Sequence, residues 1–147
     1  MAHPSISPYS AFETRDGQLI LISIQSDREW RMLCEHFLQR PELGRDPRFA
    51  TNVARVASRS QTDGLVAEAF ARMSHDEAMA ALDRADVAMA SVNDMAGLST
   101  HPHLRRIEVD TPNGPVSYPA PAPRVAGETR SYGPVPGLPA PHLETEN

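Results

Sequence analysis

The chain has 147 residues and a mass of 16.1 kDa, a size typical of one compact domain. Apolar residues make up 40% and charged residues 22%, so the composition supports a hydrophobic core and excludes wholesale disorder. The net charge of −5 and the sequence pI near 5.6 argue against a surface for nucleic acid or for an anionic membrane.

Prolines mark three regions of the chain. Two of the 14 prolines lie in the first eight residues and seven lie between Pro119 and Pro141. We therefore predict a linker-like opening segment at 1–14, a folded body at 15–118 and an extended Pro-rich segment at 119–147.

The folded body begins with a predicted strand at Gln18–Gln25, because Leu19–Ile22 is apolar on both faces. A helix follows, since Ser26 and Glu29 form a capping box, and Pro41 ends it. Its apolar residues recur at helical spacing and are expected in the core. They are Trp30, Leu33, Cys34, Phe37 and Leu38.

Further helices are predicted in the middle of the chain. One begins at Ser60, and a second begins at the capping box of Ser74 and Glu77. Asn93 is expected to cap a last helical turn through Leu98. The residues expected to face the core are Leu65, Val66, Ala69, Phe70 and Met73 of the first helix and Ala78, Met79 and Leu82 of the second.

A hairpin is predicted at Ile107–Tyr118, where apolar and polar residues alternate around the turn Asn113-Gly114. The fold class is therefore a small α+β domain. It would hold a short sheet made of the strand plus the hairpin, packed by three to four helices and followed by the Pro-rich segment.

The residue types exclude several chemistries. All 14 basic residues are arginine, so a Schiff-base lysine and a P-loop lysine are absent. Cys34 is the single cysteine, which excludes an intrachain disulfide and an iron–sulfur cluster.

The longest apolar run, Leu19–Ile22, is far shorter than the roughly 20 residues that span a bilayer. We expect a cytoplasmic protein with no signal peptide, membrane or nucleic-acid partner.

The candidate reactive side chains each have a structural alternative. His101 and His103 are a close histidine pair, but a structural loop is favoured over a metal site. Cys34 lies on the apolar stripe, which favours a buried, inert thiol over a nucleophile. Arg105 and Arg106 suit either a phosphate contact or plain surface. Six carboxylates are placed at helix starts and on solvent faces, namely Asp27, Glu29, Asp76, Glu77, Asp83 and Asp86. The sequence thus predicts no catalytic residue and no metal ligand.

A series of short motifs, taken in order, is more informative than any single residue. The motifs are His3-Pro-Ser-Ile-Ser-Pro-Tyr9, Ala11-Phe12, Asp16-Gly17, Asp27-Arg-Glu-Trp30, Arg40-Pro-Glu-Leu43, Asp46-Pro-Arg-Phe-Ala-Thr-Asn52, Arg55, Ser91-Val-Asn-Asp94 and His101-Pro-His-Leu104 before Ile107-Glu-Val109. Over nearly the whole chain, this series resembles the downstream part of the family III CoA-transferases, the carnitine-dehydratase and bile-acid-inducible type. The opening is most similar to members that act on small dicarboxylates.

The resemblance implies a division of labour between two parts of an enzyme. Members of this family have a large domain that carries the CoA-binding groups and an aspartate nucleophile, and they form interlocked dimers. This chain resembles the small domain and the return segment that rejoins the large domain. The resemblance therefore implies that the chain exchanges CoA between an acyl-CoA and a small carboxylate only together with a large-domain chain or as part of a homodimer. Coenzyme A thioester would be a substrate of the assembled enzyme, and the chain alone would bind no cofactor.

The opening segment is the part that the resemblance places nearest to the chemistry. His3, Pro4, Ser5 and Ile6 correspond to a lid-like loop over the active site and are the candidate substrate-binding residues. The alternative for this chain alone is an untethered, mobile N-terminus.

Three departures from the family pattern leave other functions open. Asp86-Val87-Ala88 replaces Gly-Val-Pro, Ser10 replaces a glycine, and His142–Glu146 is a reduced ending. The alternatives are a non-catalytic interaction or regulatory module derived from this domain and the remnant of an acyl-CoA racemase.

Overall fold

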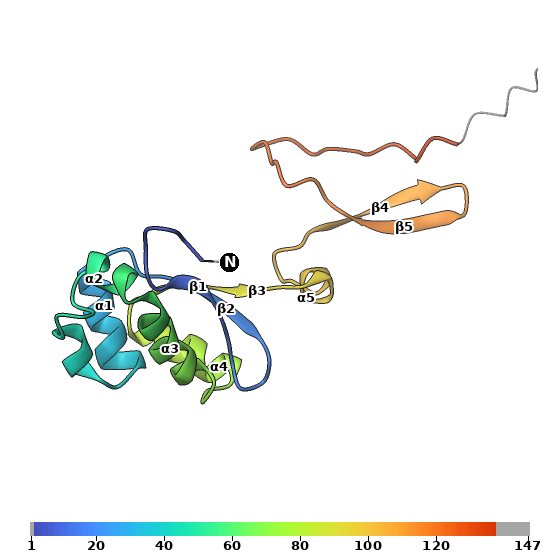
Figure 1. Ribbon diagram of the computed structural model, residues 1–147. Helices are drawn as coiled ribbons and strands as arrows, with labels where there is room; N and C mark the ends of the chain where they lie inside the picture. Colours follow the sequence, from blue (N-terminus) through green and yellow to red (C-terminus); the bar gives the residue numbers. More distant parts are fainter. Residues whose placement is uncertain (1, 138–147) are drawn as a thin grey trace, which may run out of the picture. The chain divides into compact units, whose positions relative to one another are not determined.

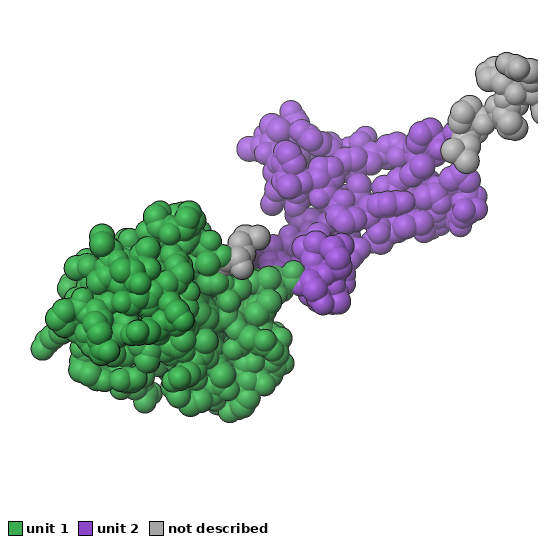
Figure 2. Space-filling view, in the orientation of Figure 1, with its two compact units in different colours: residues 1–93 green, residues 94–147 purple. Residues whose placement is uncertain are grey.

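The computed structural model describes residues 2–137 and separates into two compact units, Met1–Asn93 and Asp94–Asn147 (Figures 1 and 2). This division differs from the boundaries at 14/15 and 118/119 expected from the prolines. The opening residues contribute a strand to unit 1, and the hairpin belongs to unit 2. The departure at His142–Glu146 lies outside the described residues.

Unit 1 contains a three-stranded antiparallel sheet in the order β1-β2-β3, formed by β1 (Tyr9–Glu13), β2 (Leu19–Ser23) and β3 (Ala88–Val92). The central strand is the predicted one, and Ile20 and Ile22 are fully buried on it. Neither flanking strand was predicted, and β1 lies within the predicted opening segment at 1–14. Both are short and carry few large apolar side chains, and pairing with β2 places them in the sheet.

The helices of unit 1 begin where local capping signals stand. α1 (Asp27–Met32) begins at Ser26, and α4 (His75–Arg84) begins at Ser74, each with a complete capping box as predicted. α1 continues as a π-helical turn, η1 (Leu33–Phe37). The predicted helix does not reach Pro41, because Gln39 has a φ of +55° and turns the chain into the 3₁₀ helix η2 (Pro41–Gly44).

Two helices cover the middle of unit 1, where the sequence predicted one. α2 (Asn52–Ala57) begins at Thr51, whose side chain accepts a hydrogen bond from the N–H of Ala54, and was not predicted. α3 (Arg59–Phe70) is the predicted helix and begins one residue earlier than expected. The two follow one another with only Ser58 between them, which places side chains of both near the opening segment.

The core of unit 1 contains most of the apolar residues that the helical spacing predicted, whereas Leu65, Met73 and Met79 are only half-buried and pack against it. Trp30 is fully buried, and its indole N–H donates to the carbonyl oxygen of Leu43 at 3.3 Å. Phe70 stacks on Phe12 with ring centroids 5.3 Å apart and packs at 4.7 Å against Phe37. The sheet and the helices therefore share one aromatic core.

Unit 2 consists of a helical turn, α5 (Met95–Ser99), and a hairpin of β4 (Arg106–Thr111) and β5 (Gly114–Pro119). Asp94, one residue after the predicted Asn93, caps α5. The hairpin is confirmed, but it forms its own two-stranded sheet and is not part of the sheet of unit 1. The chain carries no helix or strand at 120–137.

The fold is therefore the predicted small α+β class, with a different distribution of strands. Within residues 2–137, every helix is too short or too polar to cross a lipid bilayer.

Candidate functional site

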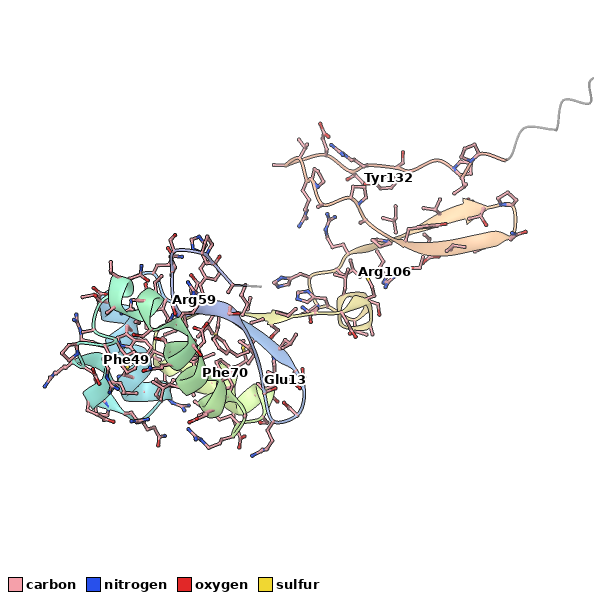
Figure 3. All side chains as sticks on the ribbon, in the orientation of Figure 1. Glu13, Phe49, Arg59, Phe70, Arg106 and Tyr132 are labelled. Atoms are coloured by element: carbon pink, nitrogen blue, oxygen red, sulfur yellow. The ribbon has the colours of Figure 1, made fainter. Side chains whose placement is uncertain are left out.

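The opening segment is bound to α2 and α3 through its backbone. The Nη2 atom of Arg59 lies within hydrogen-bond distance of three carbonyl oxygens, those of His3 at 2.8 Å, Pro4 at 3.2 Å and Ile6 at 3.1 Å (Figure 3). One guanidinium from the start of α3 thus holds a stretch of chain more than fifty residues away in the sequence.

Two further side chains complete this contact. Asn52 Nδ2 donates to the carbonyl oxygen of Ser5 at 2.9 Å, and Arg55 Nε donates to that of Ser7 at 2.8 Å. All five consecutive carbonyl groups from residue 3 to residue 7 therefore accept hydrogen bonds from Asn52, Arg55 or Arg59. We call these three side chains the carbonyl anchor. They lie three and four residues apart, on one face of consecutive helices.

Ser7 forms the inner end of the segment and is fully buried. Its N–H donates to Asn52 Oδ1 and its hydroxyl donates to Asp63 Oδ1, both at 3.2 Å. The alternative of an untethered N-terminus is therefore wrong for residues 3–7, which have fixed partners on α2 and α3.

Arg55 carries a buried positive charge beneath the segment. Besides Ser7, its guanidinium donates to the carbonyl oxygen of Phe49 at 3.0 Å and to Asp27 Oδ1 at 3.0 Å. It also lies over the Trp30 ring, 5.2 Å from the centroid. Burial lowers the pKa of Arg55, while the hydrogen bond and charge of Asp27 oppose that shift. Asp27 was expected to be a plain helix-start carboxylate, but it also compensates this buried charge.

Arg59 differs from Arg55 in its electrostatic surroundings. Its Nη1 atom is buried without a hydrogen-bond partner, and no carboxylate among residues 2–137 forms an ion pair with it. Within residues 2–137 the Arg59 guanidinium thus forms no ion pair, although Asp63, one helical turn further along α3, places a carboxylate at Ser7.

The side chains of residues 3–6 remain outside the anchor, because it contacts only their carbonyl groups. Pro4 and Ser5 are exposed, and His3 and Ile6 are half-buried. The His3 ring stacks on Tyr9 with centroids 5.2 Å apart, and its Nδ1 accepts the N–H of Ser5 at 3.2 Å. The structure therefore brings the four predicted residues together as one ordered strip on the surface of unit 1.

Cys34 is buried as predicted, and burial raises the pKa of its thiol to about 12, so it is not a thiolate at neutral pH. The rings of His101 and His103 meet edge to face at 5.4 Å. Within residues 2–137, no group of three or more His, Cys, Asp or Glu side chains is placed to hold a metal ion.

A polar chain that the sequence did not reveal joins α4 to β3. His75 Nε2 lies 2.8 Å from Ser91 Oγ, and His75 Nδ1 lies 3.2 Å from Asp76 Oδ1. Asp76 is fully exposed, so water competes for its carboxylate. The hydrogen bond between His75 and Ser91 links the start of α4 to the edge strand β3.

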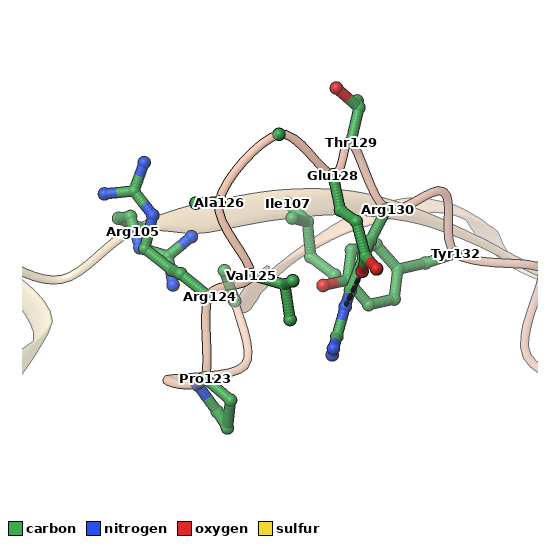
Figure 4. Close-up of a pocket in the computed structure, with 12 residues that line it drawn as sticks. Arg105, Ile107, Pro123, Arg124, Val125, Ala126, Glu128, Thr129, Arg130 and Tyr132 are labelled. Atoms are coloured by element: carbon green, nitrogen blue, oxygen red, sulfur yellow. Dashed lines mark ion pairs between the residues drawn. The ribbon is translucent and has the colours of Figure 1, made fainter.

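Unit 2 contains an open hollow of about 590 Å³ between the hairpin and the segment that follows it (Figure 4). Its lining includes Arg105, Ile107, Arg124, Val125, Arg130 and Tyr132. Arg105 donates to the carbonyl oxygen of Pro121 at 2.7 Å, and Arg130 lies 4.0 Å from Glu128. Arg106 instead donates to the carbonyl oxygen of Ser99. The hollow thus combines apolar walls with an excess of positive charge.

Sequence reasoning found the strip but not what holds it. Asn52 and Arg55 stood within the motif series without an assigned role, and Arg59 and Asp63 were not singled out. No local spacing relates them to residues 3–7, because the contacts join parts of the chain 45 to 56 residues apart.

Comparison with known proteins gives consistent results. The family described as CoA-transferase family III matches residues 1–145. An acyl-CoA transferase of Fusarium pseudograminearum is 35% identical over 112 residues, covering 75% of this chain and 24% of that protein. The succinate–glutarate CoA-transferase of Agrobacterium fabrum is 29% identical over 119 residues, covering 78% of this chain and 29% of that protein.

A solved structure gives the same relationship for the fold. The crystal structure of a CAIB/BAIF family protein from Brucella suis matches with a TM-score of 0.71 and 30% identity, covering 86% of this chain and 33% of that one. The chain spans roughly a quarter of the length of these two curated relatives and a third of that structure. Its motif series, its α+β fold and the match over residues 1–145 agree, and the chain belongs to CoA-transferase family III.

Proposed function

We propose that this chain supplies the small domain and return segment of a CoA-transferase and works only with a large-domain chain of the same family. The assembled enzyme would exchange CoA between an acyl-CoA and a small carboxylate or dicarboxylate. Relatives named as succinate–glutarate and succinyl-CoA–D-citramalate CoA-transferases support this substrate class. CoA thioester is then a substrate of the assembly, and the assembly would act in the cytoplasm.

The observation that carries the proposal is the exposure of apolar side chains in unit 2. None of its described residues is buried, although an isolated two-stranded hairpin is at best marginally stable in water. One face of the hairpin is apolar, since Ile107 pairs with Tyr118 and Val109 pairs with Val116. Val116, Tyr118, Val125, Tyr132 and Val135 are all more than 40% exposed. Exposed apolar surface of this kind is typical of interaction sites, which supports a partner for unit 2.

The arginines of the hollow extend this argument to charge. Among the described residues, Arg105, Arg124 and Arg130 line it together with one acidic residue, Glu128. We expect the partner to bring carboxylates to this surface, with apolar side chains packing on Ile107 and Val125.

The proposal is tested by recombining the two parts of the enzyme. The Agrobacterium succinate–glutarate CoA-transferase, truncated before the segment that matches this chain, is mixed with the full chain, succinyl-CoA and glutarate. We expect formation of glutaryl-CoA by the mixture and by neither component alone, because the nucleophile and the lid-like strip then reside on different chains.

Two other results would change the conclusion. A stable but inactive complex would favour the non-catalytic interaction module over the enzyme. Glutaryl-CoA formed by the chain alone, and lost on replacing one of its own aspartates, would show that the nucleophile lies within it. Arg124→Glu tests the charged part of the surface, because it reverses a charge in the hollow of unit 2 and should weaken association without affecting unit 1.

A further inference from the structure

The strip at residues 3–6 has the features of a site for an anion. We infer that His3 presents its Nε2–H group as a fixed hydrogen-bond donor to a carboxylate of a small acid, on a strip whose carbonyl groups Arg59 holds. The choice of a carboxylate as ligand rests on the proposed function. The geometry of the donor does not.

The tautomer of His3 follows from its neighbour. The backbone N–H of Ser5 has only a hydrogen to donate, and it lies 3.2 Å from His3 Nδ1. Nδ1 must therefore be the unprotonated, accepting nitrogen, and in the neutral ring the proton resides on Nε2. No hydrogen bond to Nε2 is made within residues 2–137, so this donor is available to a ligand.

The ring is also fixed in position. It stacks on Tyr9 with an interplanar angle of 10°, and the N–H of His3 donates to the carbonyl oxygen of Tyr9 at 3.1 Å. The carbonyl oxygen of His3 accepts from Arg59 at 2.8 Å. Both sides of the residue's backbone and one face of its ring are thus occupied, which orients the donor before a ligand arrives.

The charge near the strip favours an anion over a cation. Arg55 is compensated by Asp27, but Arg59 has only carbonyl partners and a buried, unpartnered Nη1 atom. An anion bound to the strip would interact with the charge of Arg59 more favourably than in bulk water, because the Nη1 atom of Arg59 is buried. A neutral ligand of the same shape would gain less from Arg59, because it offers a dipole in place of a charge.

The first measurement determines the tautomer of His3. Long-range ¹H–¹⁵N correlation spectra of the full chain are recorded at about pH 8, where ordinary imidazoles are neutral. We expect the Nε2–H form alone for His3 and a mixture of tautomers in Arg59→Gln, because the strip then loses its main contact. Arg40→Gln, which removes an exposed arginine paired only with Glu42, is the control and should leave His3 unchanged. A predominant Nδ1–H form in the unmodified chain would overturn the inference.

The second measurement tests the ligand. The ¹⁵N-labelled chain is titrated with succinate at constant ionic strength, and with succinamide as the neutral analogue. We expect saturable shifts of the His3 ring and the Ser5 amide with succinate only. His3→Phe keeps a ring for stacking on Tyr9 and should lose the saturation, whereas His101→Phe in unit 2 should not. The absence of saturation in the unmodified chain, or its persistence in His3→Phe, would overturn the inference.

Failure of this inference is distinguishable from failure of the proposed function. Succinate binding is measured on the chain alone, while CoA exchange is measured on the mixture of chains. Exchange without succinate binding would remove the role of His3 and leave the enzyme. Succinate binding without exchange would leave the anion site and remove the transferase.

Discussion

At the scale of single residues, the buried Arg55 concentrates several stabilising contacts in one side chain. Its guanidinium donates hydrogen bonds to two carbonyl oxygens and to Asp27. The Arg55 side chain is fully buried, whereas the Asp27 side chain is 43% exposed. The two partners should therefore differ in how much their removal costs, because only Arg55 leaves buried acceptors behind.

We predict that Arg55→Met lowers the free energy of unfolding by about 2–3 kcal/mol, because it strands buried carbonyl oxygens and the Asp27 carboxylate. Asp27→Asn should cost less, about 1–2 kcal/mol, because the amide oxygen of Asn can still accept from Arg55, although the buried guanidinium then lacks a carboxylate. Urea unfolding followed by Trp30 fluorescence measures both. Equal costs for the two variants would contradict the stated asymmetry.

Trp30 gives a second prediction at this scale. Trp30→Ala should lower the free energy of unfolding by about 3–5 kcal/mol, since it empties a fully buried position of the core. Trp30→Phe retains most of the volume and is the control. Chemical denaturation followed by circular dichroism tests this, and a Trp30→Ala protein as stable as the unmodified chain would contradict the core assignment.

Cys34 gives a dependence of stability on pH. Burial raises its pKa from 9.0 to about 12, so the unfolded thiol ionises at a lower pH than the folded one. The contribution of Cys34 is therefore fully present below about pH 9 and is lost as the pH rises toward about 12. Cys34→Ala should remove this alkaline part of the stability profile, which thermal melts between neutral and alkaline pH would measure. An unchanged profile would show that other groups cause the loss.

At the scale of elements, local signals predicted structure well and pairing between distant segments less well. Each capping box, at Ser26 and at Ser74, is formed within four consecutive residues at the start of its helix, and both were predicted. β1 and β3 have weak patterns of their own and become strands only because β2 lies between them. The hairpin was found because its turn and its alternation are local, but its separation from the other sheet was not visible in the sequence.

The same distinction explains the candidate site. The strip at residues 3–6 was located through its motif, whereas Arg59 and Asp63 were not, because no spacing rule connects residue 59 or 63 with residues 3–7. Only the three-dimensional structure shows that the carbonyl anchor and the strip are two halves of one arrangement.

At the scale of the whole chain, the two units differ in how they are stabilised. Unit 1 has an aromatic core, whereas unit 2 has no buried residue among those described. We predict that trypsin cuts after Arg124 and Arg130 before it cuts within unit 1, because local unfolding is least costly where few contacts are buried. Mass spectrometry of a timed digest identifies the first cuts. Early cleavage after Arg31 or Arg55 would contradict the prediction, and a bound large domain should slow the cuts in unit 2.

The carbonyl anchor has a consequence for how such a domain changes over evolutionary time. Asn52, Arg55 and Arg59 hold the strip by groups that every amino acid possesses, so its attachment to the helices does not depend on which side chains it bears. The side chains of residues 4–6 can therefore be substituted while the backbone of the strip keeps its path. New preferences among small acids would then arise by substitution at these few positions, with the underlying scaffold left unaltered.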